Sequence, residues 1–238
     1  DELIGNRPNL APRTQERTPE AMALAQLQSG HPLKGTIAQE YLAKRGINYL
    51  PANDCVFLPK QPYRDSTGQV IGHYDAILMV LTNALGKVVQ KHITYLDGPQ
   101  KAAVESPRKI QTVSSLGVSI AAKIYKTGEV MAVGEGLESC LSYAQIKRVR
   151  TLPTLNTNNL KKYRCPDYVK TLYIAADNDH NGAGQAAAYE CAHRNILQRP
   201  NLEQVIIHMP AVAGYDFNDA ILNGAQTMEF PPICRKPN

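Results

Sequence analysis

From residue 129 onward, short apolar runs alternate with stretches in which apolar residues recur at helical spacing. The apolar runs are VMAVG, TLPTL, TLYIAAD and QVIIHMP. The stretches that follow them are, in order, LESCLSYAQIKR, NTNNLKKY, GAGQAAAYECAHRNILQ and FNDAILNG. Fully apolar short strands separated by helices are typical of a parallel sheet covered by helices. The pattern therefore predicts a compact α/β domain over residues 129–225. In its third helix we expect a sheet-facing side made of Ala186, Tyr189, His193 and Ile196.

The part of the chain before residue 129 has a different pattern of hydrophobic and polar residues. Helical patterns at 19–29 and 36–45 precede two β-rich runs, HYDAILMVLT and KVVQKHITYLD, which the turn residues NALG join. This arrangement predicts an antiparallel hairpin, whereas residues 105–127 give a mixed pattern. We divide the chain into four parts: a flexible arm or linker at 1–30, a smaller basic α+β region that binds nucleic acid at 31–128, the α/β domain at 129–225 and a tail at 226–238.

Composition narrows the class of protein. Hydrophobic residues make up 43% of the chain and charged residues 20%, as in ordinary globular proteins. The sequence has neither an apolar run of membrane-spanning length nor a signal peptide, so we expect a cytoplasmic protein without a membrane partner. The first residue is Asp1, from which we expect a piece of something longer. Five scattered cysteines indicate reduced, mostly buried thiols and no disulfide framework.

Positive charge is concentrated in one segment. Residues 1–128 hold 15 Lys+Arg against 10 Asp+Glu, whereas residues 129–238 hold 11 of each. Within the first part, residues 87–126 contain seven basic residues and two acidic ones. A local positive field attracts polyanions, although a charged run is often only a solvated face. We expect contact with nucleic acid to involve Lys91, Lys101, Arg108, Lys109 and Lys123.

Acidic residues follow three of the four predicted parallel strands. Glu135 follows the first strand between two glycines, Asp177 and Asp179 follow the third, and the fourth is followed by the segment GYDFND with Asp216 and Asp219. Because ligand sites in α/β sheets gather at the carboxyl ends of the strands, we expect these carboxylates to converge. Carboxylates brought together repel one another and usually bind a cation, and hard oxygen ligands suit Mg²⁺ or Mn²⁺.

The segment DNDHNG also resembles the start of an EF-hand calcium loop. Position 12 of such a loop requires a glutamate, and this chain has Ala188 there. The preceding run TLYIAA is also typical of a strand, whereas an EF-hand loop follows a helix. A strand that ends in Asp-x-Asp and turns into a helix is therefore the better interpretation.

A strand ending in a Gly-flanked glutamate, followed 42 residues later by a strand ending in Asp-x-Asp, resembles the Toprim domain. Bacterial-type primases, type IA and type II topoisomerases, recombination-repair proteins and some nucleases share this domain. The wider run AVGEGLESCLS … YIAADNDHNGAGQAAA … VIIHMPAVAGYDFNDAI is most similar to the Toprim modules of phage and plasmid primases. The segment HITYLDGPQKAAVESPRK resembles the region that precedes Toprim in primase-helicase proteins of mobile elements.

The resemblance implies roles for particular residues. Glu135 would be the catalytic glutamate, Asp177 and Asp179 catalytic metal ligands, and Asp216 and Asp219 auxiliary acids at the same metal site, to which Glu135 also contributes. The chain departs from the family at two points. Many replicative primases place an aspartate four residues after the glutamate, where this chain has Ser139, preceded by Glu138. The zinc-binding module of such primases has no counterpart, because the chain has no Cys/His quartet.

The activity implied is synthesis of short primers on single-stranded DNA by Mg²⁺- or Mn²⁺-dependent nucleotidyl transfer, in plasmid or mobile-element replication or conjugation. The partners implied are a single-stranded DNA template, nucleoside triphosphates, and helicase or relaxase regions of a longer parent protein. Two alternatives stay open. One is a Toprim nuclease that cleaves phosphodiesters, and the other is a non-catalytic module that recruits replication or conjugation proteins.

Overall fold

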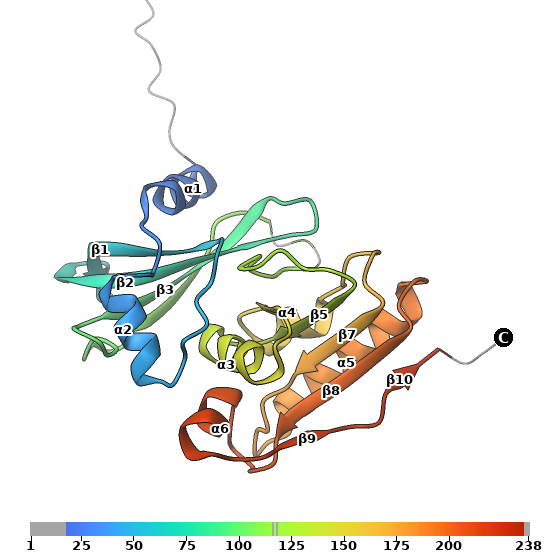
Figure 1. Cartoon of the computed structure of the whole chain (residues 1–238). Helices are drawn as coiled ribbons and strands as arrows, with labels where there is room; N and C mark the ends of the chain where they lie inside the picture. Colours follow the sequence, from blue (N-terminus) through green and yellow to red (C-terminus); the bar gives the residue numbers. More distant parts are fainter. Residues whose placement is uncertain (1–17, 116, 118, 236–238) are drawn as a thin grey trace, which may run out of the picture.

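The structure is a computed structural model that describes residues 18–115, 117 and 119–235. It contains an antiparallel sheet formed by the first part of the chain and a mostly parallel sheet formed by the second part, with helices on and between them (Figure 1). The expected fold class, a parallel sheet flanked by helices and preceded by a smaller α+β region, is confirmed. The predicted arm at 1–30 lies mostly outside the described residues.

The antiparallel sheet has the strand order β1-β2-β3-β4. Its strands are β1 (Cys55–Arg64), β2 (Val70–Thr82), β3 (Val88–Leu96) and β4 (Arg108–Thr112). The predicted hairpin is confirmed as β2 and β3, and Asn83 Oδ1 closes its turn by accepting from the backbone N–H groups of Leu85 and Lys87. The sequence did not predict β1, which contains Pro59 and Pro62 and has an irregular register; it is an edge strand, where proline is tolerated.

Helices lie on both faces of this sheet. Helix α1 (Pro19–Ser29) is N-capped by Thr18, whose Oγ1 accepts from Ala21 N at 3.2 Å, and it packs over β1, β2 and β3 through the fully buried Ala23. Helix α2 (Ile37–Lys44) lies on the opposite side and buries Tyr41 and Leu42 in the core shared with the parallel sheet. Both helices were predicted from the sequence pattern.

The second sheet has the order β10-β8-β7-β5-β6, with β9 also paired to β8. Its strands are β5 (Val130–Gly134), β6 (Thr151–Pro153), β7 (Thr171–Ala175), β8 (Gln204–Pro210), β9 (Thr227–Glu229) and β10 (Ile233–Cys234). The pairings of β5 with β6, β5 with β7 and β7 with β8 are parallel, as the apolar runs predicted. Residues 226–238, which we interpreted as a tail, include β9 and β10, which pair with β8 in the antiparallel sense.

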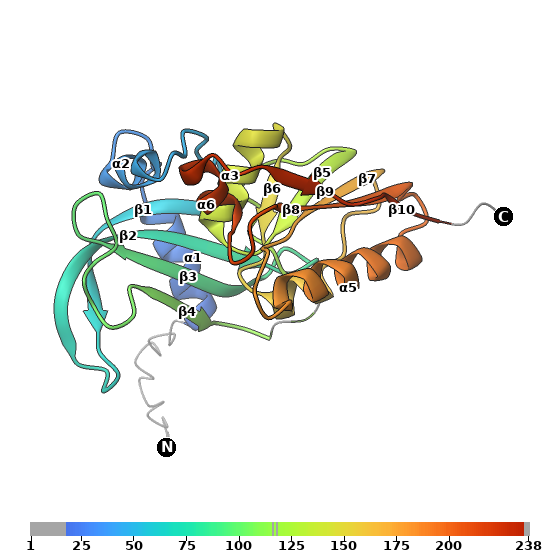
Figure 2. The ribbon, with the colours of Figure 1, turned by 90° about the horizontal axis from the view of Figure 1, so that it is seen from below.

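Helices cover both faces of the parallel sheet (Figure 2). Helices α3 (Leu137–Lys147) and α6 (Phe217–Asn223) pack together on one face, and α4 (Thr157–Lys162) and α5 (Ala183–Gln198) pack together on the other. The predicted sheet-facing side of α5 is wrong, because Ala186, Tyr189 and His193 are exposed and only Ile196 is buried. Up to Ala192 the buried side consists of small residues, which let the helix approach the sheet closely: Gly184, Ala187, Ala188, Cys191 and Ala192. Asn195 and Ile196 complete it.

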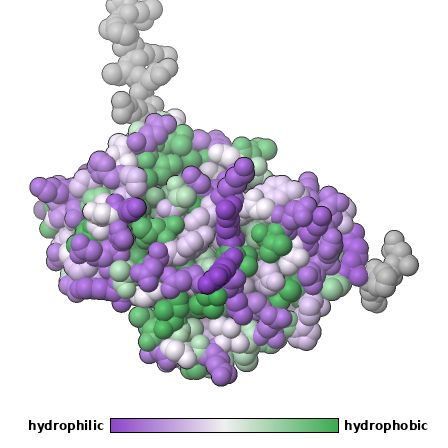
Figure 3. Space-filling model, in the orientation of Figure 1, coloured by the Kyte–Doolittle hydropathy of each residue, from purple (hydrophilic) through white to green (hydrophobic). Residues whose placement is uncertain are grey.

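One hydrophobic core connects the two sheets. It includes Met79 and Leu81 of β2, Val133 of β5 and Leu141 of α3, so the antiparallel sheet cannot move freely against the parallel one. Four of the five cysteines are buried and unpaired, as expected, while Cys234 is exposed. On the face drawn in Figure 3, apolar residues form separate patches among polar ones. Among the described residues, no helix is long and apolar enough to cross a membrane.

Candidate active site

The two neighbouring strands β5 and β7 bring the first acids together. They pair in parallel with Gly134 opposite Ala175, so Glu135 and Asp177 emerge side by side at the carboxyl edge of the sheet. A side chain at position 134 would not fit, because its Cβ would lie 2.9 Å from Cys140 Sγ and 3.0 Å from the carbonyl oxygen of Ala175. The glycine before the glutamate therefore allows the close approach of strand, helix and neighbouring strand on which the site depends.

Burial and mutual repulsion perturb both acids. The pKa of Asp177 is raised to about 8, mainly by burial and to a smaller extent by the negative charges of Glu135 and Asp216. The pKa of Glu135 is raised to about 7, mainly by burial and to a smaller extent by the negative charge of Asp179. The positive charge of Lys161 opposes this shift. Two neighbouring carboxyls that resist ionisation at neutral pH indicate an acidic cluster without enough positive charge of its own.

Asp179 lies at the edge of this cluster. Its Oδ2 accepts from the backbone N–H of Gly184 at 2.9 Å, in the first turn of α5. Gly184 is required there, because a Cβ would lie 2.5 Å from the carbonyl oxygen of Asp177. The carboxylate of Asp179 is thus already held by the helix start, while its charge still acts on Glu135.

Asp216 and Asp219 form a capping box at the start of α6. Asp216 Oδ1 accepts from the backbone N–H groups of Asn218 and Asp219 at 2.7 and 2.9 Å, and Asp219 Oδ2 accepts from Asp216 N at 3.1 Å. Asp216 also borders the acidic site, and burial raises its pKa. Both carboxylates therefore stabilise the helix, and of the two only Asp216 lines the cleft.

The acids open into a cleft of about 220 Å³ between the two sheets. Glu135, Asp177 and Asp216 line it. Three cations from the first part of the chain, Arg45, Lys101 and Arg108, line the same cleft, and the charge of Arg45 acts on Asp216. Leu155 also lines the cleft with its φ at 81°, in the left-handed region, while its N–H donates to the carbonyl oxygen of Glu135 at 2.8 Å. Such strain in a non-glycine residue is found preferentially at functional sites.

The carboxylate groups in the cleft are of the type that binds a divalent cation. Glu135 Oε1 is buried and has no hydrogen-bond partner among the described residues, so it is available as a ligand. Asp177 Oδ1 is oriented by Ser139 Oγ, which donates to it at 3.2 Å. Hard carboxylate oxygens are the ligands that Mg²⁺ and Mn²⁺ prefer. In the part of the chain that the structure describes, however, no three His, Cys, Asp or Glu side chains are already arranged around a common metal position.

The five basic residues selected from the sequence do not form one surface. Lys101 and Arg108 line the acidic cleft. Lys91 lies towards α1, where its Nζ donates to Gln26 Oε1 at 2.9 Å, and Lys109 Nζ lies 4.1 Å from the centre of the Tyr63 ring. Lys123 lines a different cavity. Arg108 and Lys109 are adjacent in β4, so their side chains point to opposite faces of the sheet.

Sequence reasoning missed two residues of the cleft. Arg45 is the C-cap of α2, and its buried Nε has no partner among the described residues. Glu138 is only 6% exposed; it accepts a hydrogen bond from the Tyr41 hydroxyl at 2.7 Å and lies 3.7 Å from Lys101 Nζ. The contact between Glu138 and Tyr41 joins positions 97 residues apart, and no local pattern in the sequence indicates it.

Comparisons with known proteins agree with this architecture. Residues 130–226 match the Toprim domain, and residues 17–119 match a domain of unknown function, DUF7146. A DNA primase domain from Pseudomonas aeruginosa superposes with a TM-score of 0.54 and 14% identity, over 87% of this chain and 75% of that chain. The DnaG catalytic core superposes with a TM-score of 0.52 and 14% identity, over the same 87% and 75%. No curated protein sequence matches significantly.

The second part of the chain is therefore a Toprim domain. The fold of the whole chain is that of the catalytic domains of DnaG-type primases. This confirms the resemblance that the strand-end acids indicated.

Proposed function

We propose that this chain is a primase-type nucleotidyltransferase, which synthesises short primers on single-stranded DNA in plasmid or mobile-element replication or transfer. One observation carries the proposal. In a primase fold, the Toprim acids Glu135 and Asp177 line a single cleft together with three cations, Arg45, Lys101 and Arg108. The acids suit cation-assisted phosphoryl chemistry, and the cations suit the phosphate groups of nucleotide and nucleic acid.

Each side chain has a proposed task. Glu135, Asp177 and Asp179 would hold Mg²⁺ or Mn²⁺, with Asp216 nearby. When bound, the cation would neutralise charge on the triphosphate of the incoming nucleotide during transfer. The unpartnered Oε1 of Glu135 is available either to the cation or to the proton of a primer 3′-hydroxyl. Ser139 keeps Asp177 in place, because it donates to Asp177 and accepts from the backbone N–H of Phe217 at 3.3 Å.

The antiparallel sheet would position the nucleic acid. Lys101 and Arg108 reach the cleft from the segment around β4, and Arg45 reaches it from the end of α2. Such side chains bind a phosphate backbone without reading its sequence, and the binding weakens as salt is added. The template and nucleoside triphosphates would meet at this cleft, and helicase or relaxase parts of a longer protein would deliver the template.

Primer synthesis tests the proposal directly. The chain is incubated with single-stranded DNA, labelled ribonucleotides and Mg²⁺, and both new oligonucleotides and cleavage of end-labelled template are measured. We expect synthesis, and a loss of at least about a hundredfold in Glu135→Gln, the usual scale for removing a positioned acid–base group. Glu190→Gln, on the exposed side of α5, is the matched control and should keep full activity. Template nicking without synthesis would identify a nuclease, and neither product would identify a non-catalytic module.

Metal binding is tested separately by titrating Mn²⁺ in a calorimeter. We expect weak binding without nucleotide, because such ions keep several waters when few protein ligands are present. Asp177→Ala combined with Asp179→Ala should abolish it. Binding that survives both substitutions would place the metal elsewhere and contradict the assignment.

A further inference from the structure

A second, larger cavity lies away from the acidic cleft. Its volume is about 660 Å³, and it is bordered by the turn after β2, the segment 119–127, the loop 163–168 and Arg199. The segment 119–127 precedes β5, the loop 163–168 precedes β7, and Arg199 precedes β8. Loop 163–168 and Arg199 place the cavity towards the amino ends of β7 and β8, whereas Glu135 and Asp177 follow the carboxyl ends of β5 and β7. The cavity and the acidic cleft have no lining residue in common.

Positive charge predominates around this cavity. Four cations line it, Lys123, Lys126, Arg164 and Arg199, against one carboxylate, Asp167. Arg199 Nη1 pairs with Asp167 Oδ1 at 2.8 Å. Among the described residues, the side chains of Lys123, Lys126 and Arg164 form no ion pair. Lys123 lies near the carboxylate of Asp54, so Lys126 and Arg164 remain as about two positive charges without a carboxylate beside them, which favours an anionic ligand.

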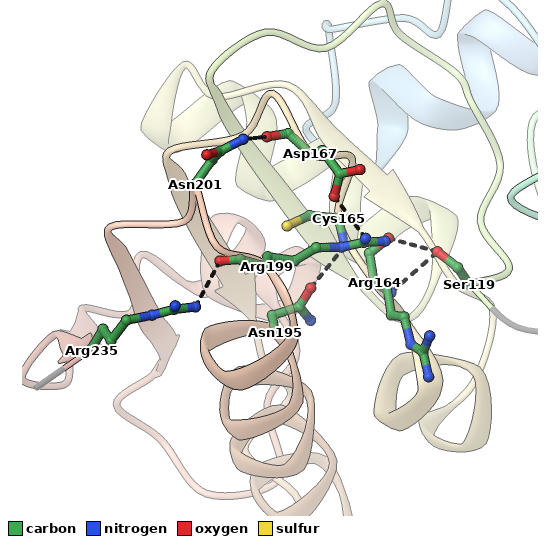
Figure 4. Close-up of polar contacts among 8 residues, drawn as sticks. All are labelled: Ser119, Arg164, Cys165, Asp167, Asn195, Arg199, Asn201 and Arg235. Atoms are coloured by element: carbon green, nitrogen blue, oxygen red, sulfur yellow. Dashed lines mark hydrogen bonds and ion pairs between the residues drawn. The ribbon is translucent and has the colours of Figure 1, made fainter.

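Three residues that line the cavity also carry buried polar atoms without partners. The Nε atoms of Arg164 and Arg199 and Thr82 Oγ1 are buried and make no hydrogen bond within the described part of the chain. Each such group costs about 1–3 kcal/mol when it is left unpaired. In Figure 4 the Arg199 guanidinium reaches Asp167, while the Arg164 guanidinium points away from that pair. Ser119 Oγ donates to the carbonyl oxygen of Arg164 at 2.6 Å and fixes the backbone at this position.

Aromatic rings form the apolar part of the wall. Tyr125, Tyr163 and Leu152 are buried beside the cavity, and Tyr168 is 52% exposed at its border. The Tyr168 hydroxyl is within 2.8 Å of Thr127 Oγ1, which holds its ring in place. Flat rings beside cations suit a ligand with a planar apolar group and an anionic group, and the volume is in the range of small-molecule sites.

We infer that this cavity is a second nucleotide site, which binds a single nucleoside phosphate apart from the acidic cleft. The phosphate would accept from Arg164 and the lysines, while Arg199 stays paired with Asp167, and the base would lie against the tyrosines. An acidic peptide would bind the same cations, but its aliphatic side chains would stack on the tyrosine rings less favourably than a planar base.

Calorimetry with ADP as the probe tests this inference. The titration contains EDTA, which suppresses cation-dependent nucleotide binding at the acidic cleft. We expect ADP to bind at least about tenfold more tightly than adenosine or pyrophosphate, because each of these makes only one class of contact. Arg164→Gln should weaken ADP binding about tenfold or more, the loss of one charge-assisted hydrogen bond. Tyr168→Leu should weaken ADP binding and leave pyrophosphate binding unchanged.

Control variants separate this site from the cleft and from misfolding. Lys126 is exposed at the cavity, so Lys126→Gln should keep the fold and still weaken ADP binding. Arg108→Ala in the cleft and Lys34→Gln on the surface should leave ADP binding unchanged. Absence of ADP binding overturns the inference. Loss of ADP binding in Arg108→Ala with retention in Arg164→Gln also overturns it, and so does displacement of ADP by a single-stranded oligonucleotide, which would make the cavity part of a nucleic-acid path.

Discussion

Removing the buried carboxylate of Glu138 should loosen the connection between the Toprim domain and the antiparallel part of the chain. Glu138 belongs to α3, and its partners Tyr41 and Lys101 belong to the first part of the chain. Burial alone would raise its pKa, but the Lys101 charge and the hydrogen bond from Tyr41 hold the pKa of Glu138 below its ordinary value. The charged form is therefore stabilised in the folded protein.

The structure sets the size of the effect. In Glu138→Ala the buried Tyr41 hydroxyl loses its acceptor, which costs about 1–3 kcal/mol. The Lys101 ammonium also loses its partner, but its side chain is 29% exposed, so water compensates part of that loss. We therefore expect Glu138→Ala to lower the free energy of unfolding by about 3 kcal/mol in total. Glu138→Gln keeps an acceptor for Tyr41 and loses only the charge, so about 1 kcal/mol is expected.

Urea unfolding measured at several pH values is the assay. A carboxyl with a depressed native pKa stabilises the fold above its unfolded pKa, near 4.3, and this contribution disappears as pH falls through the native pKa. The difference in unfolding free energy between wild type and Glu138→Gln should therefore be largest near pH 7 and vanish in acid. A difference that stays constant down to pH 3, or a Gln variant as unstable as the Ala variant, would refute the reasoning. In a double-mutant cycle, Tyr41→Phe should couple to Glu138→Ala by about 1 kcal/mol.

Three further predictions concern the cleft. In EDTA, the stability of the protein should fall as pH rises from about 4 to 8, because the native pKa of Asp177 is raised to about 8 and the folded state holds its proton longer than the unfolded chain. Asp177→Asn should flatten this slope, and an unchanged slope in urea unfolding would contradict the prediction. Arg108→Ala should weaken binding to single-stranded DNA of any sequence and lower its salt slope by about one in fluorescence anisotropy, while Lys109→Ala, on the opposite face of β4, should change neither; equal effects would count against the cleft as the DNA site. Gly184→Ala should lower stability by about 1–3 kcal/mol in thermal unfolding, because its Cβ would lie 2.5 Å from a backbone carbonyl oxygen. Gly136→Ala, with open space around the new Cβ, should be nearly neutral, and similar losses in both would show that packing at position 184 is unimportant.

The sequence alone predicted the succession of strands and helices along the chain in the Toprim domain, and the acids at the strand ends. Both depend on local patterns: apolar runs, helical spacing and turn glycines are read within a few residues. The convergence of Glu135 and Asp177 followed from one topological rule, that parallel strands place their carboxyl ends at the same edge. The edge strand β1 was missed because its prolines interrupt the local pattern.

The tertiary structure decided which side chains share an environment. Charge counting placed Arg108 and Lys109 together, but the alternation of a strand puts one in the cleft and the other over the Tyr63 ring. In α5, close approach to the sheet selected small residues for the buried side in place of the larger ones that helical spacing suggested. Arg45 reaches the cleft, and Glu138 meets Tyr41 and Lys101, only because one core packs the two sheets together. Contacts of this kind join residues far apart in the chain, and their energies depend on burial and partners that exist only after folding.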